Sequence, residues 1–187
     1  MVSQQLLLLS VLLPSSAALP QTATLNLKLF QRTSSVVAHP SVEVTVEDGY
    51  KVISGGAYVS YSGPGQLLTA SYPVGETKWI AKSKDHLKSS HGTVTAVAMG
   101  LHDPNDEWEV FHTSEISGKT AHPSTMTHMT QNYRMVGGGA IDHWTGQGNL
   151  LTGSYPYDED TWKVSGKDHL RSDPARIMAF AIGRGPI

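Results

Sequence analysis

The 187-residue sequence contains no cysteine. This absence excludes disulfide-stapled folds, thiol catalysis, iron–sulfur clusters and zinc sites with cysteine ligands. An excess of one charge sign is also missing, because 14 Lys and Arg stand against 16 Asp and Glu, which gives a formal net charge of −2. Without a basic excess to release counterions from a polyanion, the sequence predicts neither nucleic acid nor a membrane surface as a partner.

Long hydrophobic runs are confined to the N-terminus. An apolar stretch at 6–13, too short to span a bilayer, is followed by small residues at 16–18 that suit signal peptidase. We interpret residues 1–18 as a signal peptide, which predicts a secreted protein or one in the secretory-pathway lumen. No later apolar stretch reaches membrane length, and the sequence has no Asn-x-Ser/Thr site for an N-glycan.

An internal repeat is the strongest signal in the sequence. Residues 38–101 align with residues 121–184 at a constant offset of 83, without a gap and with 26 identical pairs among 64. Two copies of one unit therefore make up most of the chain. The predicted organisation is a signal peptide 1–18, an N-terminal extension 19–37, a first repeat 38–101, a connector 102–120 and a second repeat 121–187.

Short strands are the predicted structure of each repeat. Residues 42–46 alternate as Val-Glu-Val-Thr-Val, residues 93–99 are rich in β-branched and apolar side chains, and no window carries a helical stripe. The glycine-containing segments 62–65 and 145–148 are typical of turns between strands. We expect an all-β fold with about five strands per repeat, in which the tandem duplication forms an antiparallel β-sandwich or barrel-like body with pseudo-twofold symmetry. A further strand in the connector, around Trp108, is expected to join the two halves.

The order of motifs resembles a known type of repeat. Each copy contains Gly-Gly-Ala, then Leu-Leu-Thr-x-Ser-Tyr-Pro, then Trp, then Lys-Asp-His, followed by an apolar strand. The first copy has Ser54 where the second has Gly137, so the Gly-Gly-Gly-Ala form occurs only once. This pattern is similar to a repeat of uncharacterised secreted proteins from bacteria and filamentous fungi. The resemblance implies secretion and an all-β fold, and it carries over no active site.

Polar residues present in both repeats are interpreted as structural. In each copy an Asp and a His are adjacent, and neighbouring strand residues point to opposite faces, so the two side chains cannot pair as in a catalytic triad. We expect each Asp to cap the turn after the Trp-containing strand and each His to bond a backbone carbonyl. The matched Trp residues are expected in the core. The structural set is Asp85, His86, Asp168, His169, Trp79 and Trp162.

Polar residues present in one repeat only are the candidate functional residues. Residues 142–144 read Asp-His-Trp where the equivalent residues 59–61 read Val-Ser-Tyr. We predict that His143 acts as the catalytic base or acid and that Asp142 tunes it. The plain alternative is that both side chains are solvated on an outer strand face. The predicted ligand-binding residues are Trp144, Tyr61, Tyr157 and His128.

Sequence motifs for other chemistries are absent. The chain has no Gly-x-Ser-x-Gly, no Walker loop, no Rossmann fingerprint in a strand–helix context and no His-Glu-x-x-His. We therefore predict no cofactor and no metal, although a discontinuous site built from the nine histidines stays open.

Two functions from different classes remain. The first is a small-molecule-binding protein that acts as a cofactor-independent isomerase or cyclase on a hydrophobic, secondary metabolite by acid–base catalysis. The second is a non-catalytic, lectin-like module in which the matched pairs Trp79/Trp162 and Tyr72/Tyr155 stack on sugars. Binding stoichiometry separates them, because matched sites predict two ligands per chain and a site in the second repeat predicts one.

Overall fold

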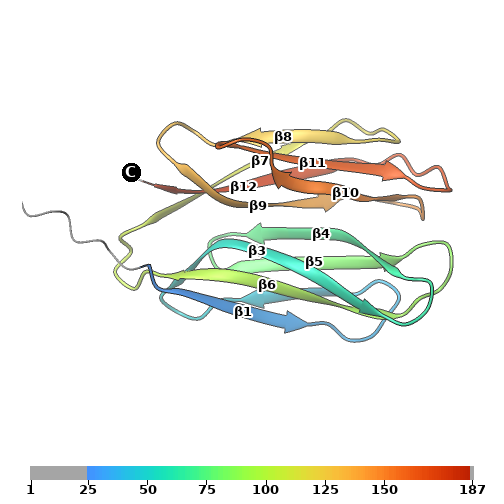
Figure 1. Ribbon diagram of the computed structural model, residues 1–187, viewed down its shortest axis with the longest axis horizontal. Helices are drawn as coiled ribbons and strands as arrows, with labels where there is room; N and C mark the ends of the chain where they lie inside the picture. Colours follow the sequence, from blue (N-terminus) through green and yellow to red (C-terminus); the bar gives the residue numbers. More distant parts are fainter. Residues whose placement is uncertain (1–24, 186–187) are drawn as a thin grey trace, which may run out of the picture.

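The computed structural model describes residues 25–185, so the predicted signal peptide lies outside the described residues. Within this range the chain forms twelve strands that pair antiparallel, and it contains no helix (Figure 1). The all-β prediction is confirmed. The strands are β1 (Leu27–Thr33), β2 (Ser41–Thr45), β3 (Tyr50–Tyr61), β4 (Gln66–Val74), β5 (Lys78–Asp85), β6 (Gly92–His102), β7 (Glu109–Ile116), β8 (Ser124–His128), β9 (Arg134–Asp142), β10 (Asn149–Pro156), β11 (Thr161–Asp168) and β12 (Ile177–Gly185).

The strands form two sandwich-like units of equal topology, which lie one above the other in Figure 1. The first unit, β1 to β6, has one layer in the order β1-β6-β3 and another in the order β2-β5-β4. The second unit, β7 to β12, repeats this with β7-β12-β9 and β8-β11-β10. The layer β2-β5-β4 continues into β9-β12-β7, so one six-stranded sheet runs through both units.

The repeat includes one more strand than the sequence predicted. β1 pairs with β6 so that Leu27 faces Leu101, and β7 pairs with β12 so that Val110 faces Arg184, which is the same register at the offset of 83. The predicted extension and connector therefore each supply the first strand of a six-stranded unit. The β-bulges repeat as well, since the β4–β5 ladder shifts around Thr69 and the β10–β11 ladder shifts around Thr152.

The core of the first unit is built around Trp79. Its side chain is fully buried, and its indole Nε1 donates to Ser71 Oγ at 3.0 Å. Gly55 lies over the indole ring, where an added Cβ would collide with the ring atoms. The second unit repeats the indole bond, with Trp162 Nε1 3.0 Å from Ser154 Oγ. Trp79 therefore lies in the core of the first unit, whereas Trp162 is only partly buried.

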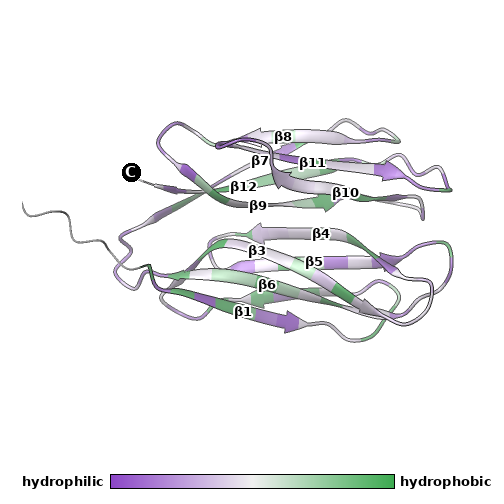
Figure 2. Cartoon of the chain, in the orientation of Figure 1, coloured by the Kyte–Doolittle hydropathy of each residue, from purple (hydrophilic) through white to green (hydrophobic). Residues whose placement is uncertain are grey.

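The two units meet along β4 and β9. Ala70 faces Ile141 and Ser71 faces Ala140 in a short ladder. Beyond it, the ring of Tyr72 stacks on Phe180 of β12, with centroids 5.0 Å apart. In residues 25–185 no matching ladder joins β3 to β10, so a pseudo-twofold relation between the units stays a prediction. Figure 2 shows hydrophilic residues along β5, the strand that pairs with β4. Lys84, near the end of β5, is buried.

Candidate functional site

A pocket of about 240 Å³ opens where the two units meet. The first unit contributes the end of β5 with the residue after it, and His39, two residues before the neighbouring strand β2. The second unit contributes the loop after β9. The pocket therefore exists only because the duplication places two units side by side. We call it the inter-unit pocket; its lining residues are His39, Lys84, Asp85, His86, Trp144, Thr145, Gly146 and Gln147.

Lys84 places a buried ammonium group at this pocket. The residue is 1% exposed, and its Nζ donates to the carbonyl oxygen of Gly146 at 3.1 Å. The same Nζ lies 4.2 Å from the centroid of the Trp144 ring and 4.0 Å from a carboxylate oxygen of Asp173. Burial lowers the pKa of Lys84, while Asp173, Asp142 and Asp85 oppose that shift. The ammonium is thus held by one carbonyl, one ring face and nearby acids.

Two acids of the second unit lie behind Lys84 and differ in their surroundings. Asp142 is 3% exposed, and neither carboxylate oxygen has a hydrogen-bond partner among the described residues. Burial raises the pKa of Asp142 to about 7, with Lys84 opposing the shift and Asp173 adding to it. Burial acts on Asp173 as well, but the backbone N–H groups of Asn149 and Gly146 hold its pKa below the usual value. The ionised form of Asp142 is therefore poorly stabilised, whereas hydrogen bonds stabilise the ionised form of Asp173.

His39 and Asp85 form an imidazole–carboxylate pair at the mouth of the pocket. His39 Nε2 lies 3.0 Å from Asp85 Oδ1, and the His39 ring meets Trp144 edge-on at 5.4 Å between centroids. Because an ionised carboxylate only accepts, Nε2 carries the hydrogen and Nδ1 presents its lone pair. This is the arrangement in which a carboxylate orients an imidazole as a general base.

The pair exists in one unit only. In the second unit Asp168 Oδ1 accepts from the amide of Asn149 at 2.9 Å, rather than from a histidine. In both units the other carboxylate oxygen accepts a backbone N–H five residues on, at 3.4 Å for Asp85 and 2.9 Å for Asp168. Each acid therefore contacts the turn that follows its strand.

The two shared histidines meet at the junction. His86 Nδ1 lies 2.8 Å from the carbonyl oxygen of Gln147, which belongs to the other unit. Among the described residues the His169 side chain makes no such bond. The rings of His86 and His169 stack, with centroids 5.2 Å apart and planes at 15°. These residues therefore help to join the units as well as to end their own strands.

The structure does not bring the predicted catalytic residues together. Asp142 is buried, whereas the next residue, His143, is exposed, as expected for neighbours at the end of a strand. Burial and the charge of Lys82 lower the pKa of His143. Asp142 instead lies close to Lys84, so its tuning partner is a lysine and not His143.

The predicted ligand-binding residues are dispersed, with one exception. Trp144 lines the inter-unit pocket. Tyr61 is 55% exposed and lines a separate shallow pocket, and Tyr157 is 57% exposed with the Lys163 ammonium 5.0 Å from its ring. His128 Nδ1 lies 2.9 Å from Thr161 Oγ1. These three residues form no common site.

The sequence contains a further signal that points to the inter-unit pocket. At three positions the second unit has gained a polar or larger residue, namely Asp142 for Val59, Trp144 for Tyr61 and Asp173 for Ser90. All three gained residues surround one residue, Lys84 of the first unit. The gain therefore marks the junction between units rather than a site within the second.

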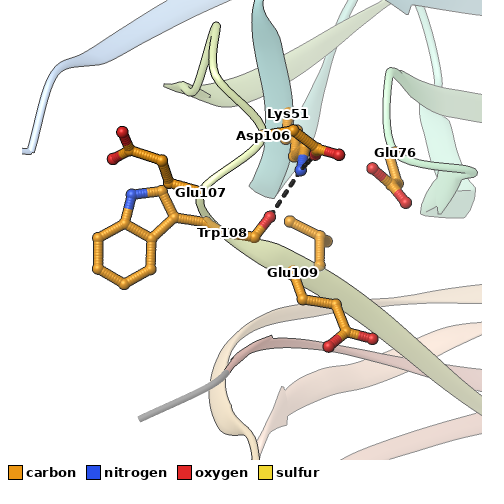
Figure 3. Close-up of a pocket in the computed structure, with 7 residues that line it drawn as sticks. Lys51, Glu76, Asp106, Glu107, Trp108 and Glu109 are labelled. Carbon is orange, nitrogen blue, oxygen red and sulfur yellow. Dashed lines mark hydrogen bonds and ion pairs between the residues drawn. The ribbon is translucent and has the colours of Figure 1, made fainter.

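A second pocket, of about 340 Å³, lies near the start of β3 and is lined mainly by acids. Figure 3 shows Lys51 between Asp106 and the backbone of Trp108, with Glu76 and Glu109 at the rim. Lys51 Nζ donates to the Trp108 carbonyl oxygen at 2.6 Å and pairs with Asp103 and Asp106. The lysine is thus saturated, and it ties the first unit to the segment that leads into β7.

A scan against protein-family models finds no match, and a search of curated proteins finds no relative. Residues 25–185 contain no cluster of three or more His, Asp or Glu side chains placed to hold a metal ion. In the same range no helix is long and apolar enough to cross a membrane.

Proposed function

We propose that this protein binds one small organic molecule at the inter-unit pocket and assists proton transfer on it, as an isomerase or cyclase does. One observation carries the proposal: the pocket brings the His39–Asp85 pair, the Lys84 ammonium and the Trp144 ring together from three separate segments. A base, a cation and an aromatic face are the groups that such a reaction needs.

The proposed step is a proton transfer next to a carbonyl or similar acceptor. Nδ1 of His39 takes a proton from carbon, and the electron pair left behind moves onto the acceptor oxygen. The ammonium of Lys84 stabilises that developing negative charge. Return of the proton to a different carbon gives an isomer. Alternatively, the carbanion adds to a second carbonyl carbon of the same molecule, which closes a ring as the C=O π bond breaks, and the resulting oxyanion takes the proton back from His39. Neither outcome changes the oxidation state of the whole molecule, so the step needs no electron acceptor.

Asp85 acts here as a positioning residue. Its carboxylate holds the hydrogen of His39 on Nε2 and stabilises the imidazolium that forms when Nδ1 accepts a proton. Because Asp85 is itself held by the backbone N–H of Ser90, its orientation is fixed by the turn that follows β5. Substitution of Asp85 should therefore impair the reaction by changing the preferred tautomer of His39.

The lectin-like alternative loses its main support in the first unit. Trp79 is fully buried, so its ring cannot stack on a sugar. Tyr72 stacks on Phe180 at the junction between the units. Since the matched aromatic residues have unlike surroundings, they do not supply two equivalent sugar sites.

Native mass spectrometry tests this proposal. We would incubate the protein with a metabolite extract of its producing organism and, separately, with a panel of oligosaccharides. One extract-derived molecule per chain, released at unchanged mass but with altered chromatographic retention, supports an isomerase or cyclase. Two sugars bound per chain would contradict the proposal and favour two matched binding sites.

Two single variants locate the chemistry. His39→Ala should abolish conversion of the bound molecule, because it removes the base. The matched control is His122→Ala, at the equivalent position of the second unit, where Asp168 is bonded to Asn149 instead. His143→Ala should retain conversion. Loss of conversion in His143→Ala with full activity in His39→Ala would overturn the assignment of the base.

The route to the secretory pathway is part of the proposal. It rests on the apolar and small-residue pattern of residues 1–18. N-terminal sequencing of the protein from culture medium should find a start near residue 19. An intact N-terminus in protein retained inside the cell would contradict it.

A further inference from the structure

A larger and mainly apolar groove adjoins the inter-unit pocket. It has a volume of about 410 Å³, within the range of sites that hold small organic ligands. His86 lines both the groove and the inter-unit pocket, so the two spaces meet at this side chain. We call it the leucine groove; its lining residues are Pro64, Gly65, Leu67, His86, Leu150, Lys167 and His169.

The walls of the groove suit an apolar molecular body. Leu67 and Leu150, at equivalent positions of the two repeats, both line it. The stacked rings of His86 and His169 form another part of the wall. His86 binds a carbonyl through Nδ1, and its buried Nε2 has no hydrogen-bond partner among the described residues. Such a surface gains by covering its apolar parts with a ligand.

The charge at the groove is positive and uncompensated. Lys167 is exposed and forms no ion pair within residues 25–185. The adjacent acid in the sequence, Asp168, is already engaged by Asn149 and by the backbone N–H of Asp173. A negatively charged ligand group is therefore the natural partner of Lys167.

The backbone next to His169 is strained. Leu170 has a φ of 62°, in the left-handed region that a bulky residue rarely adopts. Its side chain is 73% exposed, so burial of apolar surface does not offset this cost. Strain of this kind is concentrated at ligand-binding sites. The equivalent Leu87 has no positive φ, so the strain belongs to the second unit only.

We infer that the leucine groove binds an amphipathic carboxylate, with its apolar body between Leu67 and Leu150 and its carboxylate at Lys167. This inference rests on the proposed function and names its substrate class: the reacting part of the molecule extends past His86 into the pocket of His39. The groove supplies binding, and the His39–Asp85 pair supplies the chemistry.

Calorimetric titration with three compounds of one carbon skeleton tests the inference. The probes are 4-phenylbutyrate, 4-phenylbutanol and 4-phenylbutylamine, which is a cation near neutral pH. We expect the carboxylate to bind about tenfold more tightly than the alcohol, as for one added charge-assisted bond, and the amine to bind most weakly. Equal affinity for carboxylate and alcohol, or no detectable binding of any of the three, would overturn the inference.

A matched pair of lysine variants locates the charge. Lys167→Met should bring the affinity for 4-phenylbutyrate down to that for the alcohol, while the affinity for the alcohol stays unchanged. Lys163→Met, on the same strand but outside the groove, should leave all three affinities unchanged. Because Lys167 is exposed and unpaired in the described part of the chain, its loss should not unfold the protein. Full preference for the carboxylate in Lys167→Met would refute the role of this lysine.

The outcome separates the groove from the chemistry. If the protein prefers 4-phenylbutyrate but forms no isomer of any extract-derived molecule, the groove is supported and the proposed catalysis is rejected. If it forms an isomer but shows no preference for the carboxylate, the catalysis is supported and the groove is rejected.

Discussion

Replacement of Asp142 by valine should make the protein more stable at neutral pH. The carboxyl of Asp142 is buried next to Lys84 and has no hydrogen-bond partner among the described residues. Valine is the residue at the equivalent position 59, so the equivalent strand of the first unit, β3, accommodates it. Lys84 keeps Asp173 and the Gly146 carbonyl as partners in the variant. The substitution therefore removes a poorly solvated acid without leaving an unpaired lysine.

The magnitude follows from the pKa of Asp142, which folding raises from 3.8 to about 7. The folded state then binds this proton more tightly than the unfolded chain, so stability falls as pH rises between these two values. From pH 5 to pH 7 the loss amounts to about 2 kcal/mol, at 1.4 kcal/mol for each pKa unit, and it levels off above pH 7. In Asp142→Val this contribution disappears.

The assay is urea unfolding of both proteins at pH 5 and at pH 7. Because other groups also titrate, the informative quantity is the difference between the proteins, which should grow by about 2 kcal/mol in favour of Asp142→Val at the higher pH. An exposed control, Asp48→Asn, should show no such growth. Parallel pH dependences for the variant and the unaltered protein would refute the reasoning.

Further predictions concern the core and the strained turn. Gly55→Ala should destabilise the protein by about 3 kcal/mol or more, since its new Cβ would collide with the buried Trp79 ring, whereas Gly56→Ala should be nearly neutral because nothing lies within 4 Å. Urea midpoints compare the two, and equal midpoints would contradict the packing described. Leu170→Gly should stabilise by about 1 kcal/mol through relief of the positive φ. A lower melting temperature in Leu170→Gly would show that the leucine makes a stabilising contact.

Most of the fold could be predicted because the internal repeat is detectable in the sequence alone. An offset of 83 maps β2 to β6 onto β8 to β12, and the matched Trp and Gly residues of each copy pack on one another. β1 lies in the segment that was predicted only as an N-terminal extension, whereas β7 corresponds to the strand predicted around Trp108. Because β1 and β7 share no identical residue at equivalent positions, the repeat did not reveal them as equivalent strands. Both are held by backbone ladders at a sheet edge, which a sequence can satisfy with many side chains.

The candidate site was only partly predictable, since it is assembled from both units. His39 and Asp85 are 46 residues apart, and nothing in either local pattern indicates that they meet. Lys84 belongs to a shared motif, yet it is buried while its equivalent Lys167 is exposed. The difference arises from the packing of Trp144 and the acids of the second unit on Lys84 only. The polar residues gained in the second copy indicate the junction only through their partner in the first copy, Lys84.

Amide NMR of ¹⁵N-labelled protein titrated with 4-phenylbutyrate maps where the ligand binds. If the ligand site lies at the junction of the two units, we expect shift changes concentrated in residues 64–67, 84–87, 144–150 and 167–170. Changes concentrated around Trp162 on the second unit, or around Lys51 at the acidic pocket, would contradict it.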